Sequence, residues 1–304
     1  MEIHNTIEPF VNDTVTALGY FDGVHLGHRA VIGSAIAEAA RRGVQSSVLS
    51  FDMSARRAQG KGTLDLMPMS ERKRFIANLG VDEYLLLDFD KIGDMDCDEF
   101  VCNILGDGCL HAQAVCCGAD FRFGRARAGD VDRLRELCYE IGIDVIVVGE
   151  IELDGKAVST TRIKEAVVNG DVEAAEEMLG HPYGFILPVT HGKKLAGKLG
   201  FPTINQAFPS DVMTPRFGVY ASQSVVGGRV YDAITNVGVR PTVRDDGAVA
   251  LETHIFDFKG DLYEADIETR LKRFVRDERR FESDVQLKAQ VLADIESVRR
   301  VPEL

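Results

Sequence analysis

Two histidines within a glycine-rich segment are the residues whose spacing most directly suggests chemistry. Residues 19–28 read GYFDGVHLGH, which places His25 and His28 three residues apart with Gly27 between them. The segment follows the apolar run VTAL and leads directly into the helical pattern RAVIGSAIAEAARR. Glycine lets a backbone approach a ligand closely, and a helix N-terminus attracts phosphate through its free N–H groups and positive dipole end. The junction therefore predicts a nucleotide site.

The chemistry expected at this site is transfer of a nucleotidyl group. Such a reaction mainly requires positioning and charge stabilisation, so histidine donors and Mg²⁺ suffice without a protein nucleophile. We expect His25 and His28 to act on the triphosphate while a bound substrate attacks the α-phosphate. The residues expected to bind the nucleotide are Gly19, Phe21, Asp22 and Gly27. An H-x-G-H sequence also arises by chance among surface or core histidines, but its place between a strand and a helix favours the nucleotide site.

A second candidate phosphate site is VSTTRIK at residues 158–164, which opens a helix after the last strand of the first half. Hydroxyl and N–H groups at a helix start, followed by basic side chains, suit the β and γ phosphates of ATP. The residues expected to make these contacts are Ser159, Thr160, Thr161 and Arg162. An ordinary Ser/Thr helix cap is the alternative, and the presence of the first site favours the phosphate interpretation.

A third segment, GADFRFGR at residues 118–125, ends a strand at the edge of the sheet where ligands bind in such folds. Its candidate residues are Asp120, Phe121, Arg122 and Phe123. The aromatic rings could face a flat ring of a substrate, or they could pack inside the protein. The residues alone leave both possibilities open.

The elements that must position these segments alternate along the first half. Apolar runs at residues 15–19, 46–51, 83–89, 112–117 and 144–151 are too uniformly apolar for half-exposed strands, which indicates a parallel sheet covered on both faces. Helical patterns lie between them, one of which begins after the predicted N-cap Asp130. Alternating strands and helices predict a doubly wound, Rossmann-like α/β domain.

The pattern changes near residue 182. The helix VEAAEEML ends at Gly180 with Pro182 two residues later, which indicates a boundary between domains 1–182 and 183–304. Strand-like segments follow at 185–192, 218–226, 231–239, 251–258 and 266–275, and they predict a small antiparallel β-barrel. Ser283 and Gln286 have capping-box spacing for a closing helix. The apolar face of that helix is expected to consist of Leu287, Val291, Ile295 and Val298.

Length and composition favour two folded domains. With 304 residues, 45% hydrophobic and 27% charged, the chain can form two cores and has no room for a long disordered region. The formal charge of −13 disfavours a nucleic-acid partner. The start lacks a basic and an apolar signal region, and apolar runs are much shorter than ~20 residues, so we expect a soluble cytoplasmic protein without a membrane partner. Six cysteines in the first half, without metal-binding spacing, are expected to be buried reduced thiols.

These motifs resemble those of the bacterial bifunctional riboflavin kinase/FAD synthetases over nearly the whole chain. GYFDGVHLGH resembles the family's nucleotidyltransferase loop, GADFRFG its flavin-side loop and VSTTRIK its phosphate motif. LGFPTIN looks like the kinase P-T-x-N signature, and GVY, NVGVRPT, LETHIFDFKGDLY and RDERRF follow in the family's order. The resemblance implies phosphorylation of riboflavin to FMN in the second domain and adenylylation of FMN to FAD, with release of pyrophosphate, in the first. Riboflavin, FMN and ATP are then the small-molecule partners and Mg²⁺ the cofactor, and we expect a monomer or weak homo-oligomer.

For the kinase domain the resemblance implies specific roles. Thr203 and Asn205 bind the magnesium of MgATP. Glu252 is the general base on the riboflavin hydroxyl, and Arg276 belongs to the flavin-side loop. Oxygen ligands suit a hard cation, and a carboxylate can take the proton of a primary alcohol as it attacks the γ-phosphate. The implied ATP contacts are Gly192, Lys194, Lys198, Gly200, Pro202 and Asn236.

The sequence departs from the family's pattern in the first domain. After SSVLSF, where the family usually continues with Pro-His-Pro, the chain reads DMSARR at residues 52–57. The missing prolines predict a flexible loop in place of a rigid one, and the missing histidine predicts slower adenylyl transfer with ATP binding retained. Two alternatives stay open: a riboflavin kinase with an impaired or repurposed first domain, and a non-catalytic flavin or nucleotide sensor. Lys164 and the pair Ala196-Gly197 stand where the family often has Arg and Gly-Arg.

Overall fold

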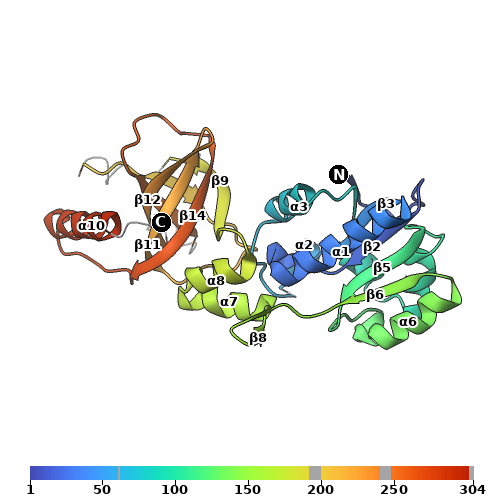
Figure 1. The fold of residues 1–304 in the computed structure, drawn as a ribbon. Coiled ribbons are helices and arrows are strands. Elements are labelled where there is room, and N and C mark those ends of the chain that lie inside the picture. The colour runs from blue at the N-terminus through green and yellow to red at the C-terminus, as the bar shows by residue number, and fades with distance from the viewer. Residues whose placement is uncertain (61, 192–199, 240–247, 301–304) are drawn as a thin grey trace. The chain divides into compact units, whose positions relative to one another are not determined.

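The computed structural model describes residues 1–60, 62–191, 200–239 and 248–300, and the chain divides into two compact units (Figure 1). The first unit comprises Met1–Leu64 and Arg72–Ser159, and the second comprises Asp65–Glu71 and Thr160–Leu304. In the described part of the chain, no helix is both long and apolar enough to cross a membrane.

The first unit contains a six-stranded parallel sheet, which confirms the predicted α/β fold. In sheet order its strands are β1 (Glu2–His4), β4 (Glu83–Asp88), β3 (Gln45–Asp52), β2 (Thr14–Leu18), β5 (Ala112–Gly118) and β6 (Asp144–Val148). Five of these were predicted from their apolar runs. β1 was missed because it has only three residues, with a single apolar one, Ile3, and lies largely exposed at the edge of the sheet.

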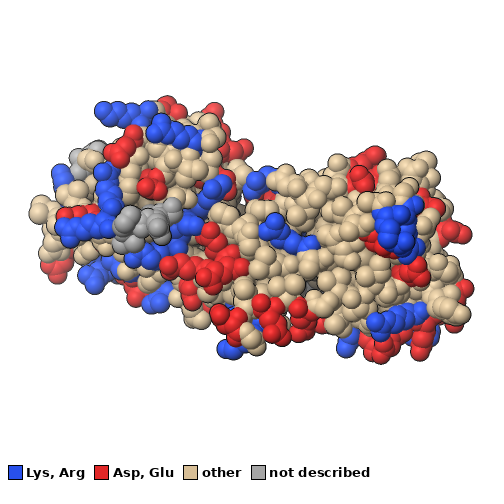
Figure 2. All heavy atoms as spheres, viewed as in Figure 1, with Lys and Arg blue, Asp and Glu red and all other residues tan. Residues whose placement is uncertain are grey.

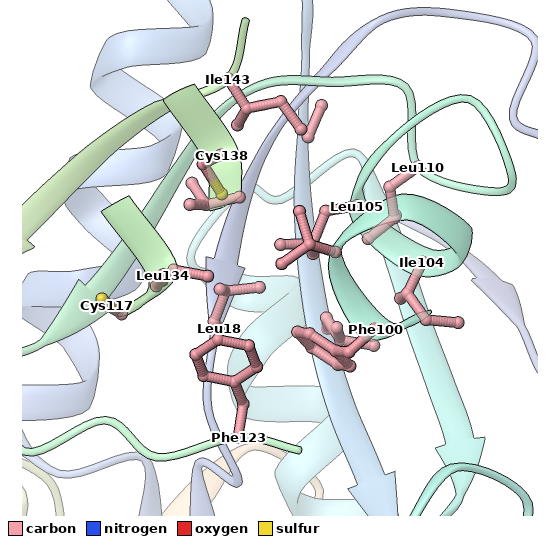
Figure 3. Close-up of a cluster of buried hydrophobic side chains, with 14 of the residues drawn as sticks. Leu18, Phe100, Ile104, Leu105, Leu110, Cys117, Phe123, Leu134, Cys138 and Ile143 are labelled. Atoms are coloured by element: carbon pink, nitrogen blue, oxygen red, sulfur yellow. The ribbon is translucent and has the colours of Figure 1, made fainter. Parts of the chain in front are cut away.

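Helices pack on both faces of this sheet. The helices of the first half are α1 (Leu26–Arg42), α2 (Ser54–Ala58), α3 (Met69–Asn78), α4 (Phe89–Ile92), α5 (Cys97–Phe100) with a π-helical turn at Val101–Leu105, and α6 (Val131–Glu140). Cys116 donates its thiol to Ser34 of α1, whereas the next residue, Cys117, faces Leu134 and Cys138 of α6 in the core of the other face (Figure 3). Because strand side chains alternate, the two neighbours lie in different layers. Asp130 caps α6 as predicted, accepting a hydrogen bond from the backbone N–H of Arg133.

The cysteines are free thiols, as predicted, but not all are buried. Cys109, Cys116, Cys117 and Cys138 are buried, whereas Cys97 is half-buried and Cys102 is exposed. Cys102 lies in the π-helical turn, whose inward residues are Val101, Ile104 and Leu105. Composition could not reveal that this helical turn leaves Cys102 on its solvent side.

The second unit contains the predicted antiparallel barrel. Its strands are β9 (Gly184–Thr190), β10 (Ile204–Ala207), β11 (Gly218–Val226), β12 (Arg229–Val239), β13 (Val249–Ile255) and β14 (Asp266–Arg276), closed in the order β10-β13-β12-β11-β14-β9. Ser222, Thr235 and Thr253 are fully buried and hydrogen-bonded in a chain across three strands. Since these residues point inward, the residues that alternate with them point outward.

Among the described residues of the second unit, the helices beside the barrel are α7 (Thr160–Asn169), α8 (Val172–Leu179) and α10 (Asp284–Arg299). The closing helix α10 packs Ile295 and Val298, two of the four residues of its predicted apolar face, in one cluster with Val219 and Ile234. Ser283 caps it by accepting from the backbone N–H of Gln286, but the predicted capping box is incomplete. The Gln286 side chain accepts from the backbone N–H of Glu282 instead, one residue before the cap.

Acidic and basic side chains are interspersed over both units on the face drawn in Figure 2. Many of them form ion pairs, such as Arg42 with Asp144 in the first unit and Lys272 with Glu176 in the second. Local pairing of this kind offsets part of the repulsion expected from a net charge of −13.

Candidate active sites

The first candidate site lies where the strand order of the parallel sheet reverses. From β2 the chain proceeds to β3 and β4 on one side, and then returns to place β5 on the other side of β2. Loops that leave neighbouring strands at such a switch point diverge and open a crevice for ligands. The segment at 19–28 follows β2 and the segment at 118–125 follows β5, so the two predicted ligand loops leave adjacent strands at the same edge.

The loop after β2 is a tight, buried turn. Phe21, Gly23 and Val24 all have left-handed backbone conformations, with φ values of 56°, 80° and 40°. Each non-glycine residue in this region costs roughly 1–2 kcal/mol, and the cost is greatest for a β-branched residue such as Val24. Phe21 and Val24 are each 1% exposed, so packing and hydrogen bonds must hold the strained turn.

The turn brings the two predicted catalytic histidines into contact. The rings of His25 and His28 stack with their centroids 3.5 Å apart, and Nδ1 of His25 accepts a hydrogen bond from the backbone N–H of His28 at 3.3 Å. His25 is thereby the N-cap of α1. A Cβ atom at Gly27 would lie 3.2 Å from the His25 ring, and one at Gly19 would lie 2.8 Å from the Phe21 ring. A side chain at Gly19 would displace the Phe21 ring, and one at Gly27 would crowd the His25 ring.

Burial keeps both imidazoles neutral. Desolvation lowers the pKa of His25 from 6.5 to about 4, although the negative charge of Asp120 acts in the opposite direction. Desolvation also lowers the pKa of His28, and the neighbouring His25 and Arg72 lower it further. Because Nδ1 of His25 is an acceptor, the neutral ring carries its proton on Nε2 and can donate there. Nδ1 of His28 is buried and has no hydrogen-bond partner within the described residues.

Arg72 lies beneath the loop, and sequence reasoning missed it. Its side chain is fully buried and lies 3.7 Å from the carboxylate of Asp22, which is itself 1% exposed. It also donates to the Tyr20 carbonyl oxygen at 3.1 Å. In the sequence Arg72 belongs to the charge run SERKR, which is typical of a solvent-exposed helix, so no signal pointed to it.

The predicted phosphate motif begins beside the same loop. The carbonyl oxygen of Val158 lies 3.9 Å from the position of a Cβ at Gly27. Ser159 follows Val158, and α7 then begins at Thr160, so Thr160, Thr161 and Arg162 occupy the first turn of a helix as predicted.

The predicted flavin-side loop divides between surface and core. Asp120 is exposed and acts electrostatically on His25. The rings of Phe121 and Phe123 stack at 5.9 Å, but Phe123 is 5% exposed and belongs to the hydrophobic core beside Leu18 and Phe100 (Figure 3). Arg122 lines a hollow of about 360 Å³ next to α6. Phe123 is therefore packed in the core, Phe121 is partly buried against that core, and Asp120 and Arg122 are exposed.

The second candidate site is a row of residues on adjacent barrel strands. Asn205 of β10 pairs in register with Glu252 of β13, Glu252 with Asn236 of β12, Asn236 with Val219 of β11, and Val219 with Arg276 of β14. Since neighbouring strands lie about 4.8 Å apart, the row brings five segments of the sequence together on the outside of the barrel. Glu252 is exposed, and Asn205 beside it is 8% exposed.

Several of the predicted residues in and beside this row form hydrogen bonds with neighbouring segments. Arg276 is held by Asp294 of α10 through three short contacts of 2.7–3.1 Å, so it anchors the closing helix to the barrel. Asn236 donates to Glu278 at 3.2 Å. The carbonyl oxygen of Pro202 accepts from Nδ1 of His254 at 2.8 Å, which secures the chain just before Thr203. Gly200 has a φ of 101°, and Gly192, Lys194 and Lys198 lie outside the described residues.

The segment that replaces Pro-His-Pro is a short helix. β3 extends to Asp52, whose carboxylate accepts from the backbone N–H of Ser54, and α2 follows. Arg56 pairs with Asp90 at 2.6 Å, and Arg57 donates to the hydroxyl of Tyr20 at 2.9 Å. The prediction of a flexible loop was therefore wrong, because side-chain contacts on both sides take the place of the missing prolines.

Comparisons with known proteins identify the family of the chain. The family model for FAD synthetase matches residues 7–162, and the model for riboflavin kinase matches residues 179–302. A bifunctional riboflavin kinase/FMN adenylyltransferase from Pseudomonas fluorescens is 36% identical over 98% of this chain and 95% of its own length. The protein of that name from Escherichia coli K12 is 33% identical over 96% and 94%. A crystal structure described as a macrolide-efflux protein from Streptococcus pneumoniae has a TM-score of 0.87 and 28% identity, covering 99% of this chain and 100% of that one. The chain therefore belongs to the bifunctional riboflavin kinase/FMN adenylyltransferase family, with an FAD synthetase domain followed by a riboflavin kinase domain.

Proposed function

We propose that this chain uses ATP to phosphorylate riboflavin to FMN at the barrel row, and transfers AMP from ATP to FMN at the histidine loop, giving FAD and pyrophosphate. The observation that carries the proposal is that the predicted residues meet: Asn205, Glu252 and Asn236, from separate motifs, lie on adjacent strands, and His25 stacks on His28 within one loop at the switch point. Family membership supports both activities.

In the kinase reaction Glu252 is the general base. Its carboxylate takes the proton of the riboflavin primary alcohol as the alcohol oxygen attacks the γ-phosphorus of ATP, and ADP leaves. Glu252 is exposed, so a substrate can reach it. Thr203 and Asn205 are two residues apart in an extended chain, and their oxygens are hard donors of the kind Mg²⁺ prefers. When bound there, Mg²⁺ neutralises charge on the phosphates.

Binding of the kinase substrates is assigned to the ends of the row. We propose that Gly192, Lys194, Lys198, Gly200 and Pro202 contact ATP on the Thr203 side. Asn236 also contacts ATP, whereas Arg276 serves the flavin at the opposite end of the row. Because Arg276 is held by Asp294, its contribution to the flavin is to keep its own loop in place rather than to donate directly to the ring.

In the adenylyl transfer a phosphate oxygen of FMN attacks the α-phosphorus of ATP, and pyrophosphate leaves. His25 and His28 contribute as neutral N–H donors, because burial lowers the pKa of each ring. Gly19, Phe21, Asp22 and Gly27 shape the loop, and Ser159, Thr160, Thr161 and Arg162 contact the remaining phosphates. Asp120, Phe121 and Arg122 face the flavin, while Phe123 supports Phe121 from the core.

The two activities are assigned to residues 1–182 and 183–304, in a cytoplasmic protein that acts on small molecules as a monomer or weak homo-oligomer. The replacement of Pro-His-Pro by α2 favours a second candidate function, a riboflavin kinase with an impaired first domain. The first candidate converts FMN to FAD, whereas the second leaves FMN as the end product.

One chromatographic experiment separates them. The protein is incubated with riboflavin and MgATP, and separately with FMN and MgATP, and flavins and pyrophosphate are quantified over time. The first candidate requires FMN and then FAD from riboflavin, with one pyrophosphate per FAD. FMN without FAD supports the second candidate, and no conversion of either flavin overturns both in favour of a sensor.

A further inference from the structure

Arg72 places a positive charge in a fully buried position under the histidine loop. The side chain is 0% exposed, and its guanidinium carbon lies 4.4 Å from the centroid of the Tyr20 ring. One terminal guanidinium nitrogen, Nη1, donates to the Tyr20 carbonyl oxygen, and the other terminal nitrogen, Nη2, lies 3.7 Å from the Asp22 carboxylate. Burying a charge is unfavourable unless it is paired and hydrogen-bonded, and two of the groups that do so here, the Tyr20 carbonyl and the Asp22 carboxylate, belong to the loop.

The contacts of Arg72 bracket the most strained part of the turn. Tyr20 and Asp22 flank Phe21, which has a φ of 56°, and Val24, three residues after Phe21, has a φ of 40°. The Phe21 ring in turn meets the edge of His28 with centroids 5.3 Å apart. A continuous path of contacts therefore runs from Arg72 through the turn to the histidine pair.

We propose that Arg72 is a positioning residue for adenylyl transfer, which holds the strained turn at residues 20–24 and thereby the stacked rings of His25 and His28. Arginine suits this role because its planar fork reaches a carbonyl and a carboxylate at once while stacking on an aromatic ring. A lysine in the same place keeps the positive charge, but its donors are on a single nitrogen instead of a planar guanidinium. The inference rests on the proposed adenylyltransferase function of the loop.

The test compares Arg72→Met and Arg72→Lys with the unmodified chain, using FMN and MgATP as substrates. Loss of histidine positioning should lower kcat for FAD formation about 10²-fold in Arg72→Met, with KM for MgATP changed less than about threefold, because the defect lies in geometry rather than in binding. The kcat of Arg72→Lys for FAD formation should lie between that of Arg72→Met and that of the unmodified chain. Arg74→Met, the same change two residues further along α3, is the matched control, and FMN formation from riboflavin is the internal reference.

A spectroscopic readout distinguishes positioning from general instability. The groups that act on the His28 ring are His25 and Arg72, and both lower its pKa. In Arg72→Met the NMR titration of His28 should therefore shift to higher pH, and its ring signals should lose the upfield shift that stacking on His25 produces. Arg74→Met should leave both signals unchanged.

Each outcome decides the proposal. If Arg72→Met does not fold, Arg72→Lys decides, since it retains a positive charge opposite Asp22. Unchanged kcat for FAD formation in Arg72→Lys, and in Arg72→Met if it folds, would overturn the positioning role. If the unmodified chain makes no FAD, the adenylyltransferase assignment itself has failed, which is a different result.

Discussion

Acid should destabilise the first unit through His25, and His25→Asn should remove this sensitivity. The pKa of His25 is about 4 in the folded protein and 6.5 without burial, so between these values the unfolded chain binds a proton that the folded chain does not. The contribution of His25 to the free energy of unfolding is therefore fully present above pH 6.5 and is lost as the pH falls towards 4. Linkage gives a loss of about 2 kcal/mol at pH 5 and about 3 kcal/mol at pH 4 from this shift.

The structure explains why protonation is unfavourable. Nδ1 of His25 accepts the backbone N–H of His28 and caps α1, so a proton on Nδ1 removes the acceptor as well as placing a charge in a buried site. Asparagine is a good N-cap acceptor and does not titrate. His25→Asn should therefore match the unmodified chain at pH 8 to within about 1 kcal/mol.

Urea unfolding from pH 4 to pH 8 is the assay, with the transition of the first unit followed by hydrogen exchange of its sheet amides. At each pH, the free energy of unfolding of the unmodified chain is subtracted from that of His25→Asn. The difference at pH 8 measures the effects that do not depend on titration, in capping and in the stacking on His28. The difference should grow by about 2 kcal/mol in favour of the variant between pH 8 and pH 5. A difference that stays constant over this range would refute the reasoning, because it would mean that His25 titrates alike in the folded and unfolded chain.

Three further predictions concern single side chains. Glu252→Gln should lower FMN formation at least about 10²-fold while FAD formation from supplied FMN continues, since only the kinase loses its general base; equal FMN production contradicts the assignment. His28→Ala should show the reverse pattern in the same chromatographic assay, and FAD formed at the unmodified rate would exclude His28 from the mechanism. Asp294→Ala should destabilise the barrel unit by about 3 kcal/mol in urea unfolding because it leaves Arg276 without its buried partner, and an unchanged midpoint would show that the pair contributes nothing.

The elements of the fold were largely predictable because most are long enough to carry a periodic pattern. The helix Val172–Leu179 and the strand Gly218–Val226 have the predicted boundaries, since glycines mark the end of the first and the start of the second. β1 and β10 have three and four residues, too few for a period to emerge, and they were found only from their pairing. Their registers matter for the sites, because β10 carries Asn205 to Glu252.

The candidate sites were predictable where chemistry is local in sequence. His25 and His28 are three residues apart, so their contact follows from one loop. Contacts between segments that are distant in the sequence could not be predicted in this way. Arg72 pairs with Asp22, which lies 50 positions earlier in the chain. Asp294 pairs with Arg276 from a helix for which the sequence predicted only an apolar face. Both are charged residues that became buried, which a pattern of exposed charge does not predict.

The helix α2 changes what the missing Pro-His-Pro segment implies for adenylyl transfer. A flexible loop would affect both the binding and the chemistry of ATP, because an ordering cost would accompany every turnover. Instead the segment forms a helix, in which Arg56 pairs with Asp90 and Arg57 donates to the Tyr20 hydroxyl. What the chain lacks is then a single imidazole donor, not a structured segment. Loss of a donor that acts in the transition state lowers kcat more than it lowers affinity. ATP should therefore still bind to the histidine loop, while FAD formation is slower.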